Sequence, residues 1–143
     1  MQYKMAIKRK YKITLSLLFP LTVAWVIISY PNNYAKEELQ RRYKINDQMW
    51  LYMTKNSHGG ATLPIIYRYY LAGDLKVNDS AILSQLNSKT LILEGTGTVY
   101  KIEADNNFNV LIHYSGKVFT LNHNVKYNYA QKNITASVSY KIN

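Results

Sequence analysis

The stretch VKYNYAQKNITASVSYKI, which runs from Val125 to Ile142, decides the fold because its apolar and polar residues alternate. The turn Gln131–Asn133 divides the stretch into two segments, Val125–Tyr129 and Ile134–Ile142. In each segment apolar and polar residues alternate with a period of two. Successive side chains of a β-strand point to opposite faces of a sheet. The stretch therefore predicts two strands, each with one packed face and one face in water.

Four further strand-like segments lie directly upstream, separated by short clusters of Gly, Asn, Asp and Ser. They are Leu91–Glu94, Thr98–Glu103, Asn109–Tyr114 and Lys117–Asn122. Strands joined by such short turns favour an antiparallel meander. We expect a mainly β (α+β) domain whose sheet curls into a small open barrel or a strongly bent sheet, because curling protects its edges.

The segments before Leu91 predict how the domain begins. Met49–Met53 is apolar and aromatic and predicts the first strand. Leu63–Leu71 and Leu75–Val77, joined by Ala72-Gly73-Asp74, predict a hairpin. One short helix is expected over Ser80–Asn87, because Asn78 and Asp79 can cap its first turn.

An uncharged apolar run, Ile13 to Ser29, follows a basic N-terminal tail. A bilayer core needs about 20 apolar residues, with ~17 as a lower limit, so the run predicts a single membrane anchor over residues 13–30. The basic tail, residues 1–12, should stay in the cytoplasm, and in a bacterial inner membrane the remainder then lies in the periplasm. The alternative is a cleaved signal peptide with Asn33-Tyr34-Ala35 as its cleavage site.

Residues 31–48 are expected to link the anchor to a β-rich periplasmic domain over residues 49–143. Within the linker, Tyr34 to about Ile45 predicts a juxtamembrane helix. Its Glu37 and Arg41, like Glu38 and Arg42, are spaced as i,i+4 ion pairs.

Composition excludes several classes of protein. The 143-residue chain has a formal charge of +10, but from Pro31 onward only 13 Lys and Arg oppose 8 acidic residues, so direct nucleic-acid binding is not expected. The absence of cysteine excludes disulfides, thiol chemistry and a lipoprotein anchor. The 14 tyrosines suit half-buried strand faces, where the ring is packed and the hydroxyl is wet.

No catalytic constellation is present in the sequence. Gly95-Thr96-Gly97 lies between strands and lacks a third glycine, so it predicts a turn rather than a dinucleotide site. Asp105-Asn106-Asn107 lacks the glycine and the distal Glu of a calcium loop. We therefore expect no enzymatic activity, metal or cofactor.

His113 and His123 are candidate acid sensors in an exported domain, because an unperturbed imidazole titrates near pH ~6.5. The alternative is that they are ordinary structural or exposed histidines.

The order of features carries a resemblance to a known group. A basic tail and a single anchor precede an aromatic first strand at Trp50, then YRYYLAGDLKV (Tyr67–Val77) and GTGTVYKIEADNNFNVLI (Gly95–Ile112). This order resembles the small membrane-anchored accessory proteins of the ToxS, VtrC and PsaF/MyfF kind. The resemblance implies a lipocalin-like open barrel that binds and stabilises a membrane-bound activator of virulence genes and admits a bile-salt-like or acid signal.

In that interpretation a small apolar ligand would meet an aromatic lining, although an ordinary core role is favoured for each of these residues taken singly. The candidate lining residues are Trp50, Tyr67, Tyr69, Tyr70 and Tyr100. Two other classes of protein fit the sequence, a bacteriocin or effector immunity protein and a subunit of a secretion, conjugation or pilus apparatus. An adjacent gene for an anchored winged-helix activator would favour the accessory protein, and an adjacent toxin gene would favour immunity.

Overall fold

The computed structural model describes residues 37–56 and 64–143, which belong to one compact unit, Lys36–Asn143. The predicted basic tail and the anchor at Ile13–Ser29 lie outside the described residues. Within the described ranges, no helix has the length and apolar character needed to cross a membrane.

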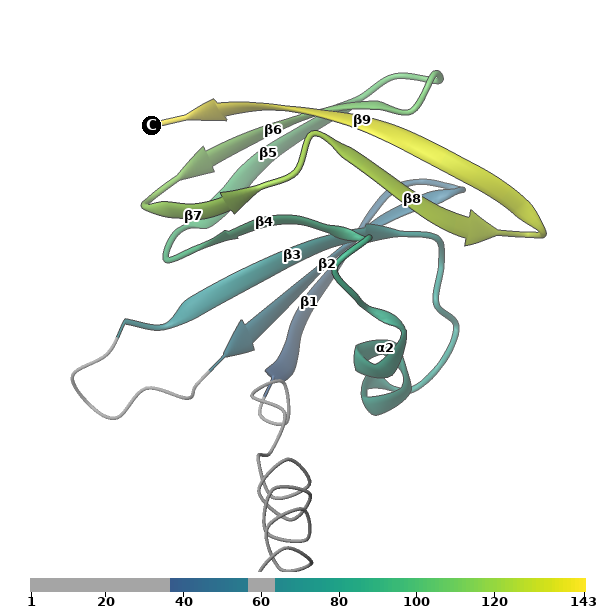
Figure 1. The fold of residues 1–143 in the computed structure, drawn as a ribbon, viewed down its shortest axis with the longest axis horizontal. Coiled ribbons are helices and arrows are strands. Elements are labelled where there is room, and N and C mark those ends of the chain that lie inside the picture. The colour runs from purple at the N-terminus through teal and green to yellow at the C-terminus, as the bar shows by residue number, and fades with distance from the viewer. Residues whose placement is uncertain (1–36, 57–63) are drawn as a thin grey trace, which may run out of the picture. The chain divides into compact units, whose positions relative to one another are not determined.

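The described residues form nine strands and one helix, arranged as two sheets (Figure 1). The elements are β1 (Glu37–Asn46), β2 (Met49–Asn56), β3 (Ile66–Ala72), α2 (Asp79–Gln85), β4 (Leu91–Gly95), β5 (Thr98–Ala104), β6 (Asn109–Ser115), β7 (Val118–Leu121), β8 (Asn124–Tyr129) and β9 (Lys132–Ile142). The first sheet has the order β1-β2-β3-β4-β7 and the second has the order β5-β6-β9-β8. The domain is mainly β, as predicted, and its sheets do not close into one barrel.

All six strands predicted after Leu91 are present, but their predicted arrangement as a meander is wrong. β7 pairs with β4 in the first sheet, with Leu121 opposite Leu93. β6 and β9 lie side by side in parallel, with Val110 opposite Val138. A period of two identifies strands but carries no information about which strands pair.

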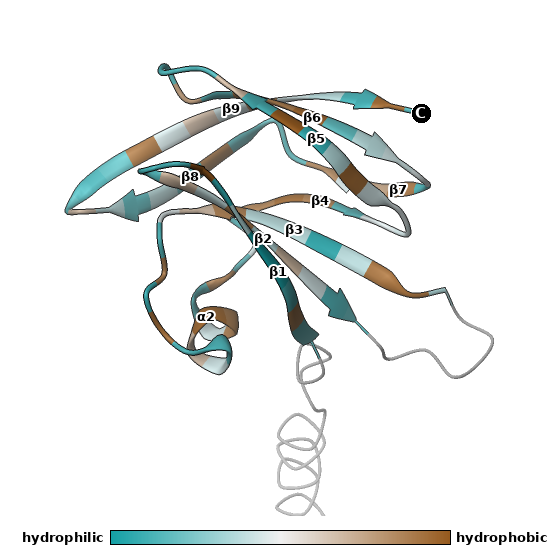
Figure 2. Ribbon diagram, turned by 180° about the vertical axis from the view of Figure 1, so that it is seen from behind, coloured by the Kyte–Doolittle hydropathy of each residue, from teal (hydrophilic) through white to brown (hydrophobic). Residues whose placement is uncertain are grey.

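The predicted juxtamembrane helix from Tyr34 to Ile45 is also wrong, because Glu37–Asn46 is strand β1. It pairs antiparallel with β2 and packs Tyr43 and Ile45 against the core. Arg42 bonds to Asp79 of α2 rather than to Glu38. β1 is the hydrophilic edge strand of the first sheet (Figure 2), so the β domain includes residues that the sequence assigned to the linker.

The predicted hairpin around Ala72-Gly73-Asp74 is not formed, since Leu75–Val77 is not a strand and β3 pairs with β4 instead. The segment after β3 is held by Tyr52, whose hydroxyl donates to the Gly73 carbonyl at 2.9 Å and accepts from the Leu75 amide at 2.8 Å. The short helix is confirmed as α2. Asn78 caps it, with its side-chain Oδ1 accepting from the Ala81 amide at 2.9 Å.

The main core lies between the two sheets. Its buried members are Met49, Leu51, Tyr69, Leu71, Ile92 and Leu93 from the first sheet, and Val110, Ile112, Tyr114, Val125, Tyr127, Ile134, Ala136 and Val138 from the second. A smaller cluster on the outer side of the first sheet joins Tyr52, Tyr70 and Ala72 to Ile82 of α2. The helix therefore covers part of that outer face.

Tyrosine hydroxyls connect this core to the backbone of the turns. Tyr127 donates to the Gln48 carbonyl at 3.1 Å, and Tyr140 donates to the Asn122 carbonyl at 2.6 Å. A buried phenol needs such a partner, while its ring contributes apolar contact area. The high tyrosine count thus fills the core and fixes the connections between strands.

Candidate functional site

A hollow of about 560 Å³ opens between β1, the edge of the first sheet, and β5, the edge of the second. We call it the β1–β5 hollow. Its apolar lining consists of Tyr43, Met53, Tyr67, Tyr69 and Val99. Its polar lining consists of Gln40, Arg41, Thr96, Thr98 and Ser115, with the backbone of Gly97. Pockets that bind small molecules have volumes of ~300–1,000 Å³, and most are apolar with a few polar groups.

Two tyrosines hold the turn between β4 and β5, which lines the hollow. Tyr69 donates to the Gly97 carbonyl at 3.1 Å and accepts from the Val99 amide at 3.3 Å. Tyr114 accepts from the Gly97 amide at 2.6 Å, and its ring meets that of Tyr69 edge to face. A Cβ at Gly97 would lie 1.8 Å from the Ser115 carbonyl oxygen, so this close approach requires glycine.

The lining from β1 includes a positive charge. Arg41 is exposed, and its Nη1 donates to the Tyr43 hydroxyl at 3.3 Å. No acid pairs with Arg41 among residues 37–56 and 64–143. The hollow therefore combines apolar rings with a cation that can pair with an anionic group on a ligand.

The structure brings together only two of the five predicted aromatic lining residues. Tyr67 and Tyr69 line the hollow. Tyr70 is buried on the opposite face of the first sheet, where Trp50 packs against the same cluster. Tyr100 is 54% exposed and lies at the outer face of the second sheet, with its ring against His113.

Tyr70 belongs to a polar cluster that ties the start of β1 to its sheet. The Oε1 atom of Glu37 accepts from the Thr54 hydroxyl at 2.8 Å, from the Tyr70 hydroxyl at 3.1 Å and from Arg68 Nη1 at 3.2 Å. Arg68 also contacts Glu94 on β4, with Nε and Oε2 3.3 Å apart. Burial, with the nearby Glu37 charge, raises the pKa of Tyr70. The cluster joins four strands, so we assign it a structural role.

The two candidate acid sensors lie in different surroundings. His113 is 9% exposed, and its Nε2 lies 3.0 Å from Oε1 of Glu103. Hydrogen bonds from Lys101 first, and then from His113, lower the pKa of Glu103. His123 is exposed, with its Nδ1 3.0 Å from the Val138 carbonyl oxygen. Only His113 has a carboxylate positioned to pair with a protonated imidazole.

Sequence reasoning missed the contributions of Arg41, Tyr43, Met53 and Val99 to the hollow. Arg41 and Tyr43 were overlooked because their segment resembled a helix. Met53 could have been found, since it shares the strand face of Met49 and Leu51 by period-two spacing. Val99 lies on the second sheet, and no local signal brings it opposite β3.

Among the residues that the structure describes, no group of three or more His, Asp or Glu is arranged to hold a metal ion. Comparison of the chain with protein-family models, curated proteins and solved structures finds no match.

Proposed function

We propose that the chain is an inner-membrane-anchored accessory protein whose lipocalin-like β domain lies in the periplasm. There it binds and stabilises a membrane-bound transcription activator of virulence genes, and the β1–β5 hollow receives a bile-salt-like signal. The observation that carries this proposal is the open side of the domain, where two sheet edges flank a tyrosine-lined hollow.

The lining of the hollow supports an amphipathic anionic ligand. Tyr43 and Tyr67 are half-buried and offer ring surface for a flat apolar body, and the half-buried Met53 adapts to irregular shapes. Tyr69 is only 1% exposed and supports the lining from the core. Arg41 is available for a carboxylate or sulfonate tail. A volume of about 560 Å³ admits a ligand of roughly bile-salt size.

The flanking edges support a protein partner. An edge strand leaves part of its backbone hydrogen-bonding groups unpaired, and a strand of another chain can add to it. β1 is long, with 10 residues, and carries only scattered apolar side chains. A partner strand at β1 or β5 would cover the hollow and make ligand and partner binding interdependent.

The ligand part of the proposal is tested by adding taurocholate to the full chain in dodecyl maltoside micelles, at a bile-salt concentration below its own micelle threshold. In NMR spectra we expect the backbone amide signals of Tyr67, Tyr69 and Val99 to shift and to saturate as taurocholate is added. Arg41→Gln should lower the affinity about tenfold, because it removes a charge-assisted hydrogen bond. Tyr100→Ala is the control because Tyr100 lies outside the hollow. Shifts that do not saturate would refute the ligand site, as would a loss of affinity in Tyr100→Ala equal to that in Arg41→Gln.

The partner part can be tested with engineered cysteines, since the chain has none of its own. Gln40→Cys places a thiol on β1 at the hollow, and Ser139→Cys places one on the outer face of the second sheet, both at exposed positions. With a thiol-reactive photocrosslinker attached to each cysteine, we expect the proposed activator, co-expressed with this chain, to crosslink to the first variant and not to the second. Equal crosslinking of both variants would contradict an interface at the open side.

An acid signal would act at His113, whose protonated ring would form an ion pair with Glu103. We expect His113→Gln combined with His123→Gln to abolish an acid response of the activator's reporter gene. A response that the double variant retains would discard the titrating histidines while leaving the ligand site unaffected.

A further inference from the structure

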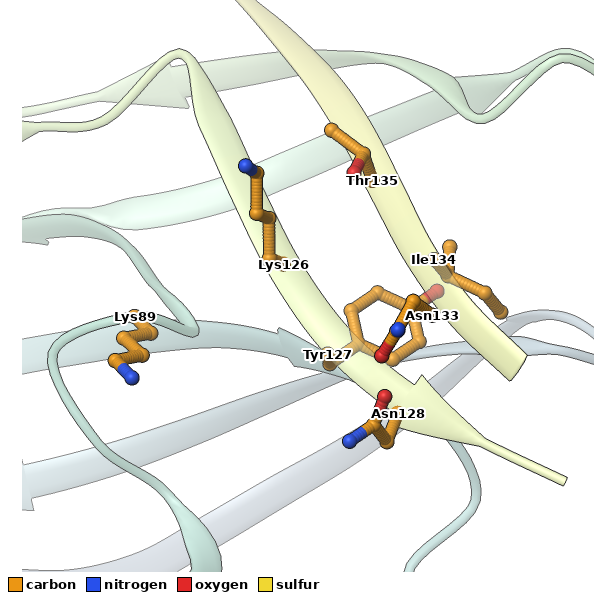
Figure 3. Close-up of a pocket in the computed structure, with 7 residues that line it drawn as sticks. All are labelled: Lys89, Lys126, Tyr127, Asn128, Asn133, Ile134 and Thr135. Atoms are coloured by element: carbon orange, nitrogen blue, oxygen red, sulfur yellow. The ribbon is translucent and has the colours of Figure 1, made fainter. Parts of the chain in front are cut away.

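A second pocket lies on the β8–β9 hairpin and shares no residue with the β1–β5 hollow (Figure 3). It has a volume of about 430 Å³. Its polar lining consists of Lys89, Lys126, Asn128, Asn133 and Thr135. We call it the hairpin pocket.

Strand register brings four of these five polar residues together. Lys126 pairs with Thr135, and Asn128 pairs with Asn133, across the antiparallel ladder. Figure 3 shows the carboxamides of Asn128 and Asn133 facing each other, with Lys89 coming from the segment before β4. The intervening pair, Tyr127 and Ile134, is buried in the main core. The polar side chains therefore project from a hairpin whose other face is fixed by packing.

The pocket carries uncompensated positive charge. From Asn106 to Asn143 the sequence contains Lys117, Lys126, Lys132 and Lys141 and no acidic residue. Within residues 37–56 and 64–143, neither Lys89 nor Lys126 forms an ion pair. Two lysines line this one concave site, and the hairpin carries no acidic residue, so the site has a local field that attracts anions.

The donor set fits one class of anion. A lysine ammonium offers only donors, while a carboxamide and a hydroxyl can each donate as well. A phosphate group carries a charge of about −1.5 to −2 and three strong acceptor oxygens, which matches two ammonium groups and several neutral donors better than a carboxylate does. We propose that the hairpin pocket binds a phosphate group, either free or in a lipid headgroup. This site goes beyond the proposed function and does not depend on the hollow.

The test uses the full chain in dodecyl maltoside micelles, which contain no phosphate, at constant ionic strength in chloride. Inorganic phosphate is the first probe, and phosphatidylglycerol mixed into the micelles is the second. In NMR spectra we expect the backbone amide signals of Lys126, Asn128 and Asn133 to shift and to saturate with at least one of the two probes. Lys89→Gln and Lys126→Gln should each weaken binding about tenfold, the effect of one charge-assisted hydrogen bond.

Lys141→Gln is the matched control, because Lys141 lies on β9 in the same acid-free part of the chain but outside the pocket. It should change the affinity less than twofold. A response to inorganic phosphate alone assigns the site to a free phosphate, and a response to phosphatidylglycerol alone assigns it to a lipid headgroup. No saturable shift with either probe, or equal weakening by Lys141→Gln, would overturn the proposal.

Discussion

Replacing Tyr52 by Phe should destabilise the domain by about 2 kcal/mol, because it removes one hydroxyl that serves two backbone groups. Tyr52 is 1% exposed, and its oxygen lies 2.9 Å from the Gly73 carbonyl oxygen and 2.8 Å from the Leu75 nitrogen. Leaving a buried polar group without a partner costs ~1–3 kcal/mol. Gly73 is buried and should contribute most of the loss, whereas the half-buried Leu75 amide can be reached by water.

The assay is urea unfolding of residues 36–143, followed by far-ultraviolet circular dichroism, with amide hydrogen exchange at Leu75 as a local measurement. The urea concentration at the midpoint of unfolding should fall. The dependence of the unfolding free energy on urea concentration should stay unchanged, since the surface exposed on unfolding is the same. Tyr100→Phe is the control, because its hydroxyl accepts from Asn143 Nδ2 at the exposed surface. A loss below about 0.5 kcal/mol for Tyr52→Phe, within the range of ordinary surface substitutions, would show that these two backbone groups do not depend on the Tyr52 hydroxyl.

Three further predictions concern the turns and the tyrosines. Gly97→Ala should cost about 2 kcal/mol or more in urea unfolding, because its Cβ would lie 1.8 Å from the Ser115 carbonyl oxygen; an unchanged midpoint would contradict this. Gln131→Gly should stabilise by ~0.5–1 kcal/mol, because Gln131 has a φ of 63° in the β8–β9 turn, and a lower midpoint would contradict this. Burial raises the pKa of Tyr127 to about 12, so its stabilising contribution is complete below the usual tyrosine pKa of ~10 and is lost as the pH rises toward 12. In a spectrophotometric titration Tyr127→Phe should remove a late-ionising phenol, and loss of one that ionises near pH ~10 would contradict the burial argument.

The strands after Leu91 could be predicted from the sequence because their alternation is local. Val125 and Tyr127 share one face by spacing alone, and both are buried. β1 could not be predicted in the same way. Its charged residues satisfy helical spacing, whereas its strand form depends on Tyr43 and Ile45 packing against a core assembled from distant segments.

The candidate site was only half predictable for a similar reason. Tyr67 and Tyr69 line the hollow because they share one strand face, whereas Tyr70, the neighbour of Tyr69, must point to the other. Period-two spacing was therefore sufficient to separate Tyr70 from the lining. The approach of Val99 to Tyr69 depends on the passage of the chain from the first sheet to the second, which local sequence does not encode.

The central proposal, an anchored accessory protein, is tested most directly by the half-life of the membrane-bound activator that we propose it stabilises. It is measured after synthesis is blocked, in cells with and without this chain. We expect the activator to decay faster when this chain is absent and the two proteins to co-purify from membranes when both are present. An unchanged half-life together with no co-purification would contradict it.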